Sequence, residues 1–132
     1  MSQRPPWLPV ALIVGVAYFV VGRVFAIPAD HVRFWRWVAL LVSVAVFATH
    51  IAYEHFRLRH STRSTAWHAA LAAAIGGLLF AVAGAVNALR GTSTASPLWL
   101  LALVAWPAFT AVPAYLVAFV ASAVLGRLGR RG

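Results

Sequence analysis

Cysteine and lysine are both absent from this 132-residue chain, and only two residues, Asp30 and Glu54, are acidic. Without cysteine the chain can form no disulfide, and it offers no thiolate for metal binding or catalysis. No pair of carboxylates and no nucleophile beside a base stands out in the sequence. We therefore expect that the protein is not an enzyme, with a lipid-modifying enzyme as the least favoured alternative.

Charge of either sign is scarce, at 10% of residues, whereas 63% of residues are hydrophobic. Four apolar runs dominate, and each reaches the length of about 20 residues with which a helix crosses a bilayer. The runs are too long and too uniform for barrel strands. The predicted fold is all-α: an integral membrane four-helix bundle with short loops, forming one transmembrane domain over residues 1–132. The expected helices span residues 7–27, 34–56, 67–89 and 98–125.

The net charge of +9 comes entirely from arginine. In a soluble chain a net charge this positive would suggest binding to nucleic acid. Here the arginines flank the apolar runs, so we expect anionic lipid, and no nucleic acid, as the partner. An excess of arginine marks the cytoplasmic side, which predicts that both termini are cytoplasmic. That side would hold Arg4, Arg57, Arg59, Arg63, Arg127, Arg130 and Arg131.

The first apolar run has two interpretations. Arg4 followed by an apolar stretch that ends near Ala26 resembles a cleaved signal peptide. The run is longer than a signal peptide's apolar region, however, and Arg23 lies beside the supposed cleavage site. A retained first helix is the favoured interpretation.

The second run carries a polar face. Polar residues recur at heptad spacing, which places them on one side of a helix, and polar side chains within a span usually face the bundle interior or water. Histidine titrates near neutral pH and a neighbouring carboxylate can orient it, so the face is a candidate ligand or proton pathway. The candidates are Ser43, His50, Tyr53 and Glu54, between Arg36 and Arg57.

Two of these candidates, His50 and Glu54, also have a structural interpretation. His50 can be a neutral imidazole hydrogen-bonded to a neighbouring helix, and Glu54 can pair with Arg57 one turn later. His55 and His60 are expected to be solvated in the basic loop. His50 and His68 differ in expected depth, so we predict no haem and no metal ion between them, and no other cofactor.

The third run carries small residues every four positions, which let helix backbones approach closely in lipid. The stripe either packs within the bundle or forms a seam between two copies of the chain. Ser64 or Thr65 is expected to cap the helix. The residues expected to pack are Ala73, Gly77, Ala81 and Gly84.

Four arginines are expected at the opposite, outer face of the membrane. They can converge around Asp30 and hold an anionic headgroup, or they can serve simply as interfacial anchors. These residues are Arg23, Arg33, Arg36 and Arg90.

Together these patterns favour a small multi-pass protein of the plasma or inner membrane. The leading hypothesis is a structural or accessory subunit that packs with a partner, or with itself, through small-residue helix faces. The alternative is a small oligomeric proton-linked transporter or channel that uses the polar face of the second helix.

Overall fold

The computed structural model describes residues 7–27, 30–91 and 98–129. It contains four α-helices, α1 (Trp7–Val24), α2 (Val32–Phe56), α3 (Thr62–Arg90) and α4 (Leu98–Leu128). Each helix is long and apolar enough to cross a membrane. The prediction of an all-helical, membrane-spanning bundle is therefore confirmed. Arg4, Arg130 and Arg131, which contributed to the predicted orientation, lie outside the described residues.

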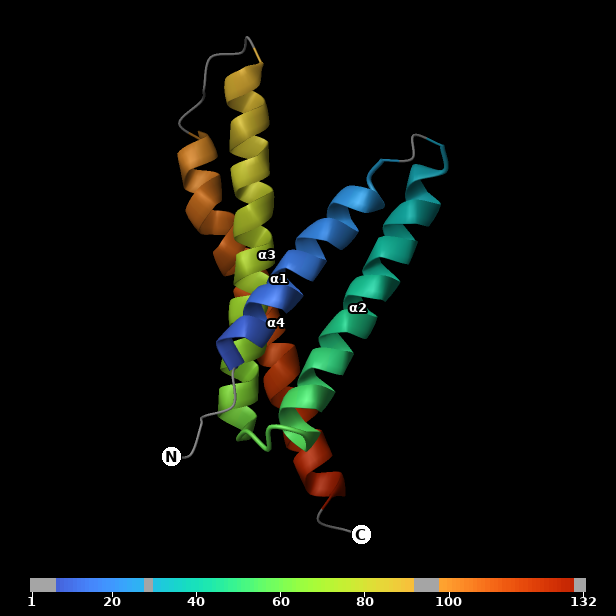
Figure 1. Ribbon diagram of the computed structural model, residues 1–132, viewed down its shortest axis with the longest axis vertical. Helices are drawn as coiled ribbons and strands as arrows, with labels where there is room; N and C mark the ends of the chain where they lie inside the picture. The colour runs from blue at the N-terminus through green and yellow to red at the C-terminus, as the bar shows by residue number, and fades with distance from the viewer. Residues whose placement is uncertain (1–6, 28–29, 92–97, 130–132) are drawn as a thin grey trace.

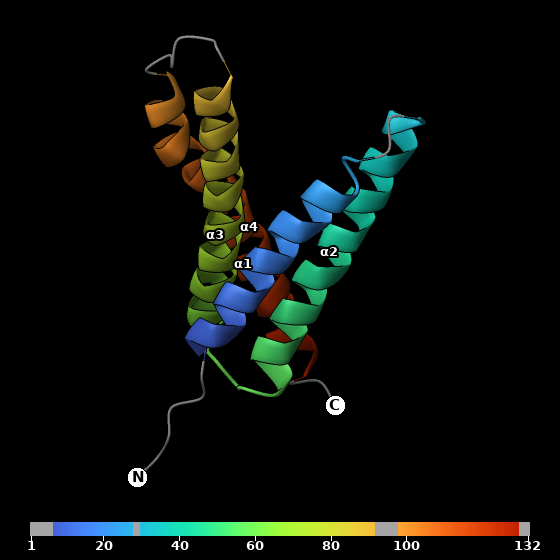
Figure 2. The same ribbon diagram turned by 45° about the horizontal axis from the view of Figure 1, so that its top comes forward.

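The helices form two antiparallel hairpins, α1–α2 and α3–α4, that diverge like the arms of a V (Figures 1 and 2). The arms meet where α1 begins, α2 joins α3, and α4 ends (Figure 1). The start of the first helix and the end of the last thus lie at one end of the molecule, as an even number of spans requires. The assignment of that end to the cytoplasm stays a prediction.

The small-residue stripe of α3 packs against α4. A side chain on Gly77 would lie 2.6 Å from the Thr110 hydroxyl and 3.1 Å from the Trp106 carbonyl oxygen, and one on Gly84 would lie 2.9 Å from the Trp99 ring. The Thr110 hydroxyl also lies 3.1 Å from the carbonyl oxygen of Ala73. The stripe therefore holds the α3–α4 hairpin together within one chain.

A second close approach joins α1 to α3. Gly15 and Gly76 face each other where the helices cross, and a side chain on Gly76 would lie 3.2 Å from the carbonyl oxygen of Gly15. A side chain on Gly15 would lie 2.9 Å from the carbonyl oxygen of Ala72. Glycine at both positions allows the backbones to pack directly, as is common in lipid.

The two hairpins share a small core near the vertex of the V. Ile51 of α2 packs there with Ala66 and Ala69 of α3 and Ala118 of α4. Phe47 and Tyr115, both partly buried, pack against this cluster. Contacts between α2 and the second hairpin thus concentrate at the end where α2 joins α3.

The start of α3 differs from the expected position. The helix begins at Thr62, five residues before the predicted start at residue 67, because the Ser61 hydroxyl accepts a hydrogen bond of 3.2 Å from the backbone N–H of Ser64. The prediction that Ser64 or Thr65 caps the helix was therefore wrong. The polar first turn is helical because its cap satisfies a free N–H group.

Candidate functional site

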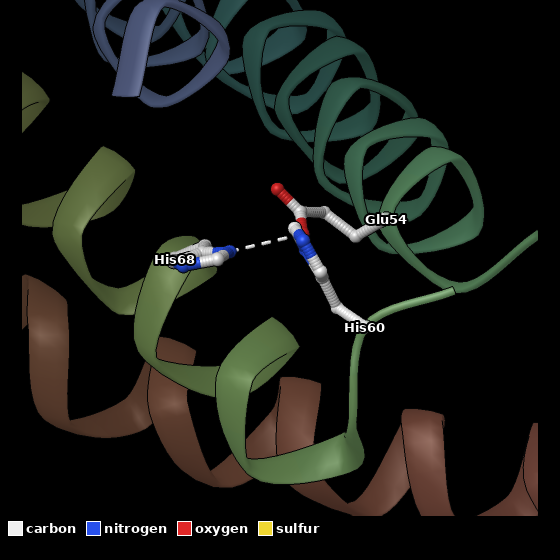
Figure 3. Close-up of side chains that lie close together, drawn as sticks. All are labelled: Glu54, His60 and His68. Atoms are coloured by element: carbon white, nitrogen blue, oxygen red, sulfur yellow. Dashed lines mark hydrogen bonds and ion pairs between the residues drawn. The ribbon is translucent and has the colours of Figure 1, made fainter. Parts of the chain in front are cut away.

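Glu54 lies at the vertex, on the last turns of α2, with none of its surface exposed. Its Oε2 atom contacts the Nδ1 atoms of His60 and His68, at 2.9 Å in the case of His68 (Figure 3). His60 belongs to the connection between α2 and α3, and His68 belongs to the second turn of α3. One carboxylate oxygen therefore gathers two histidines from different parts of the chain.

The connection after α2 brings His60 back to the carboxylate. The backbone N–H of His60 donates a 3.2 Å hydrogen bond to the carbonyl oxygen of Glu54. Arg59, just before it, adopts a left-handed conformation with φ 50°. Non-glycine residues adopt this conformation at a cost of about 1–2 kcal/mol. The contacts of His60 thus accompany a locally strained turn.

His50 approaches the same carboxylate from within α2. Its Nε2 atom lies 3.6 Å from Oε1 of Glu54, and both side chains are fully buried. Neither ring nitrogen of His50 nor Oε1 of Glu54 forms a hydrogen bond with the described residues. Buried polar atoms usually form hydrogen bonds. Oε1 of Glu54 and the ring nitrogens of His50 can therefore still bind a further partner.

Aromatic packing fixes the ring of His68. Trp7 at the start of α1 stacks on this ring with the centroids 4.5 Å apart and the planes 4° from parallel. The rings of His60 and His68 lie 5.0 Å apart at 72° to each other. The cluster formed by His50, Glu54, His60 and His68, here called the vertex cluster, therefore joins α2 to α3 and contacts α1 through Trp7.

The vertex cluster revises two expectations for this region. His60 was expected to be solvated, but only 18% of its side chain is exposed and it contacts Glu54. Glu54 was expected to pair with Arg57, yet its ion pairs among the described residues are with the three histidines. Arg57 lies exposed beyond the end of α2.

The four pathway candidates of α2 do not come together. His50 and Glu54 are adjacent and buried, whereas Tyr53 is 43% exposed on another side of the helix. Ser43 lines a separate apolar groove. Within the described residues, the polar face therefore does not form one continuous pathway.

That groove lies between the diverging hairpins and has a volume of about 930 Å³. Ser43, Val44 and Phe47 line it from α2, and Val117 lines it from α4. Glycines from α1 and α3 form part of its wall, and aromatic rings form much of the rest. These further lining residues include Gly22, Gly76, Phe80, Gly84, Trp106 and Phe109.

The four outer arginines are all exposed. Arg23 and Arg33 lie close to the turn between α1 and α2, and Arg36 lies one turn into α2. Arg90 ends α3, on the other arm of the V (Figure 1). The divergence of the hairpins thus places Arg90 on a different arm from the other three.

No known protein family, curated protein or solved structure matches the chain. The functions of the vertex cluster and of the groove are therefore inferred from their geometry.

Proposed function

We propose that this protein is a structural or accessory membrane subunit whose groove receives a transmembrane helix of a second subunit, either another copy or a different membrane protein. The observation that supports this proposal is the divergence of the hairpins, which leaves a groove of about 930 Å³ among spanning helices. A space of this size within a bilayer is filled by lipid or by protein.

The composition of the groove favours a helix. Small residues let a second backbone approach closely, and aromatic rings offer broad surfaces for dispersion contacts. The α3 part of the lining extends from Ala73 to Gly84, a rise of about 16 Å at 1.5 Å per residue. A guest helix would therefore contact the groove over about half the thickness of the hydrocarbon core.

The small-residue stripe expected to mediate association lies partly in the groove. Gly77 and Gly84 pack closely on α4, and both also line the groove together with Ala73. A guest helix in the groove would therefore meet small residues of the stripe. The proposal thus keeps the predicted role and assigns the contact to the part of the stripe that lines the groove.

Site-directed photocrosslinking tests the proposal, and the absence of native cysteine makes each introduced thiol unique. We would attach a benzophenone probe to Val44→Cys, in the groove, and to Leu41→Cys, an exposed residue outside the groove lining. In native membranes we expect a stoichiometric protein adduct from position 44 and little from position 41. An adduct of twice the chain mass identifies a second copy, and any other discrete mass identifies a partner.

Two outcomes would contradict the proposal. The groove probe would label only lipid, or positions 41 and 44 would give equal protein adducts. The same pair of variants, purified in a gentle detergent and analysed by mass photometry, shows whether the probe itself disturbs assembly.

A further inference from the structure

The vertex cluster contains the donor set of a metal centre. Glu54, His60 and His68 each offer one ligand atom, and these atoms all lie within 4.8 Å of one another. Zn²⁺ binds imidazole nitrogen and carboxylate oxygen at about 2.0–2.2 Å, so neighbouring ligands of a tetrahedral site lie about 3.3 Å apart. His68 Nδ1 and Glu54 Oε2 are 2.9 Å apart. For these atoms to surround one ion, the side chains would have to rotate so that both histidine nitrogens move away from Oε2 of Glu54, by about 0.4 Å in the case of His68.

The types of donor indicate the class of ion. Imidazole nitrogen suits Zn²⁺ and similar first-row transition metals, whereas Mg²⁺ and Ca²⁺ require mainly oxygen ligands. The group formed by Glu54, His60 and His68 offers two imidazoles and one carboxylate. We infer that Glu54, His60 and His68 bind a single divalent transition-metal ion of the Zn²⁺ type.

The environment of His50 is an independent observation that points to the same site. Its imidazole is fully buried, lies 3.6 Å from Oε1 of Glu54, and forms no hydrogen bond with the described residues. A cation bound by Glu54 compensates the cost of burying a carboxylate, which otherwise depends on neighbouring dipoles or on protonated histidines.

A metal ion at this position links the two arms of the V. Glu54 belongs to the first hairpin and His68 belongs to the second. The ion would therefore fasten the hairpins where they meet and leave the groove open at the other end. This role does not depend on what occupies the groove.

Metal titration of the complete chain tests the inference. The protein is purified in detergent with a tag that contains no histidine, treated with a chelator, and titrated with Co²⁺ while its visible absorption is recorded. Zn²⁺ is then added as a competitor, and elemental analysis measures the bound metal. We expect one ion per chain, with Zn²⁺ displacing Co²⁺.

Variants locate the site. Glu54→Gln, His60→Ala and His68→Ala should each weaken Co²⁺ binding by at least about 100-fold, since each removes a direct ligand. His55→Ala is the matched control, because His55 is near the end of α2 but outside the group of ligands. The affinity of this variant should stay within about twofold of the wild type, because His55 contributes no ligand atom to the group.

Glu54→His keeps a metal-binding donor and should restore binding to within about tenfold of the wild type. This substitution separates a metal site from a cluster held only by hydrogen bonds, and far-UV circular dichroism checks that each variant is helical. Less than one ion per two wild-type chains would overturn the inference. Equal loss of affinity in His55→Ala and His68→Ala would overturn it as well.

Discussion

Oε2 of Glu54 and Nδ1 of His68 lie 2.9 Å apart, although the two residues are fourteen positions apart and belong to different hairpins. This contact connects the end of α2 with the second turn of α3. Because Glu54 is completely buried, its hydrogen-bond partners must come from the protein around it. The vertex of the V therefore holds a buried polar junction between the two hairpins.

The first prediction concerns the carboxylate. In chelator-treated protein, Glu54→Gln should lower the free energy of unfolding by about 1.5–3 kcal/mol, the usual value for hydrogen bonds to a charged group. The amide keeps the shape of the side chain but turns one acceptor oxygen into a donor. Unfolding in mixed detergent micelles, followed by circular dichroism, measures the change.

Tyr53→Phe is the control for this substitution, because Tyr53 is next to Glu54 in sequence but is 43% exposed. It should unfold like the wild type. Equal stability of the wild type and Glu54→Gln would show that the contacts of the carboxylate contribute nothing to the fold.

The second prediction concerns metal-dependent stability. If the vertex cluster binds Zn²⁺ only in the folded protein, Zn²⁺ at 100 times its dissociation constant adds about 2.7 kcal/mol to the free energy of unfolding. A thermal melt with and without Zn²⁺ should show a higher midpoint for the wild type and for His55→Ala. His68→Ala should show no Zn²⁺-dependent shift, and a full shift in that variant would assign the stabilisation to another site.

The sequence predicts the elements of this fold more reliably than their arrangement. Spans 7–27 and 34–56 correspond closely to α1 and α2 because length and apolar composition alone determine whether a helix can cross a membrane. The crossing of α1 and α3 depends instead on Gly15 facing Gly76. That pairing has no local signal, so the V shape could not be predicted.

The candidate site was predicted in part. His50 and Glu54 were selected from helical spacing, and the structure places them together. His60 was missed because a run of basic residues usually indicates a solvated loop, and arginine at position 59 gives no sign of a left-handed turn. The signal in the sequence that could have found it is the recurrence of histidine at positions 60 and 68, on either side of the residues expected to join the two helices and after the acidic residue at position 54.

The third prediction concerns the close packing of α3 on α4. Gly77→Ala places a methyl group 2.6 Å from the Thr110 hydroxyl and 3.1 Å from a backbone carbonyl oxygen, so the helices must move apart. Overpacking of this kind typically costs about 1–3 kcal/mol. Denaturation in mixed micelles, with tryptophan fluorescence as the signal, measures the loss.

Gly126→Ala, in the same hairpin, is the matched control, because nothing lies within 4 Å of the added methyl group. Its free energy of unfolding should equal that of the wild type or exceed it by up to about 1 kcal/mol, because alanine favours the helix more than glycine does. Two variants of equal stability would mean that α3 and α4 do not pack as closely as the structure indicates.

The fourth prediction concerns the groove. Val117 of α4 lines the groove and is 56% exposed, so a larger side chain can extend into the open space without displacing the core. Val117→Trp should therefore preserve the fold while blocking a guest helix, and the adduct formed by the probe at position 44 should largely disappear. Leu116→Trp is the matched control, because Leu116 is 58% exposed but is not among the groove-lining residues. If both tryptophan variants retain the adduct, the second subunit binds elsewhere; if both lose it, the effect of tryptophan is general and the groove is not the contact.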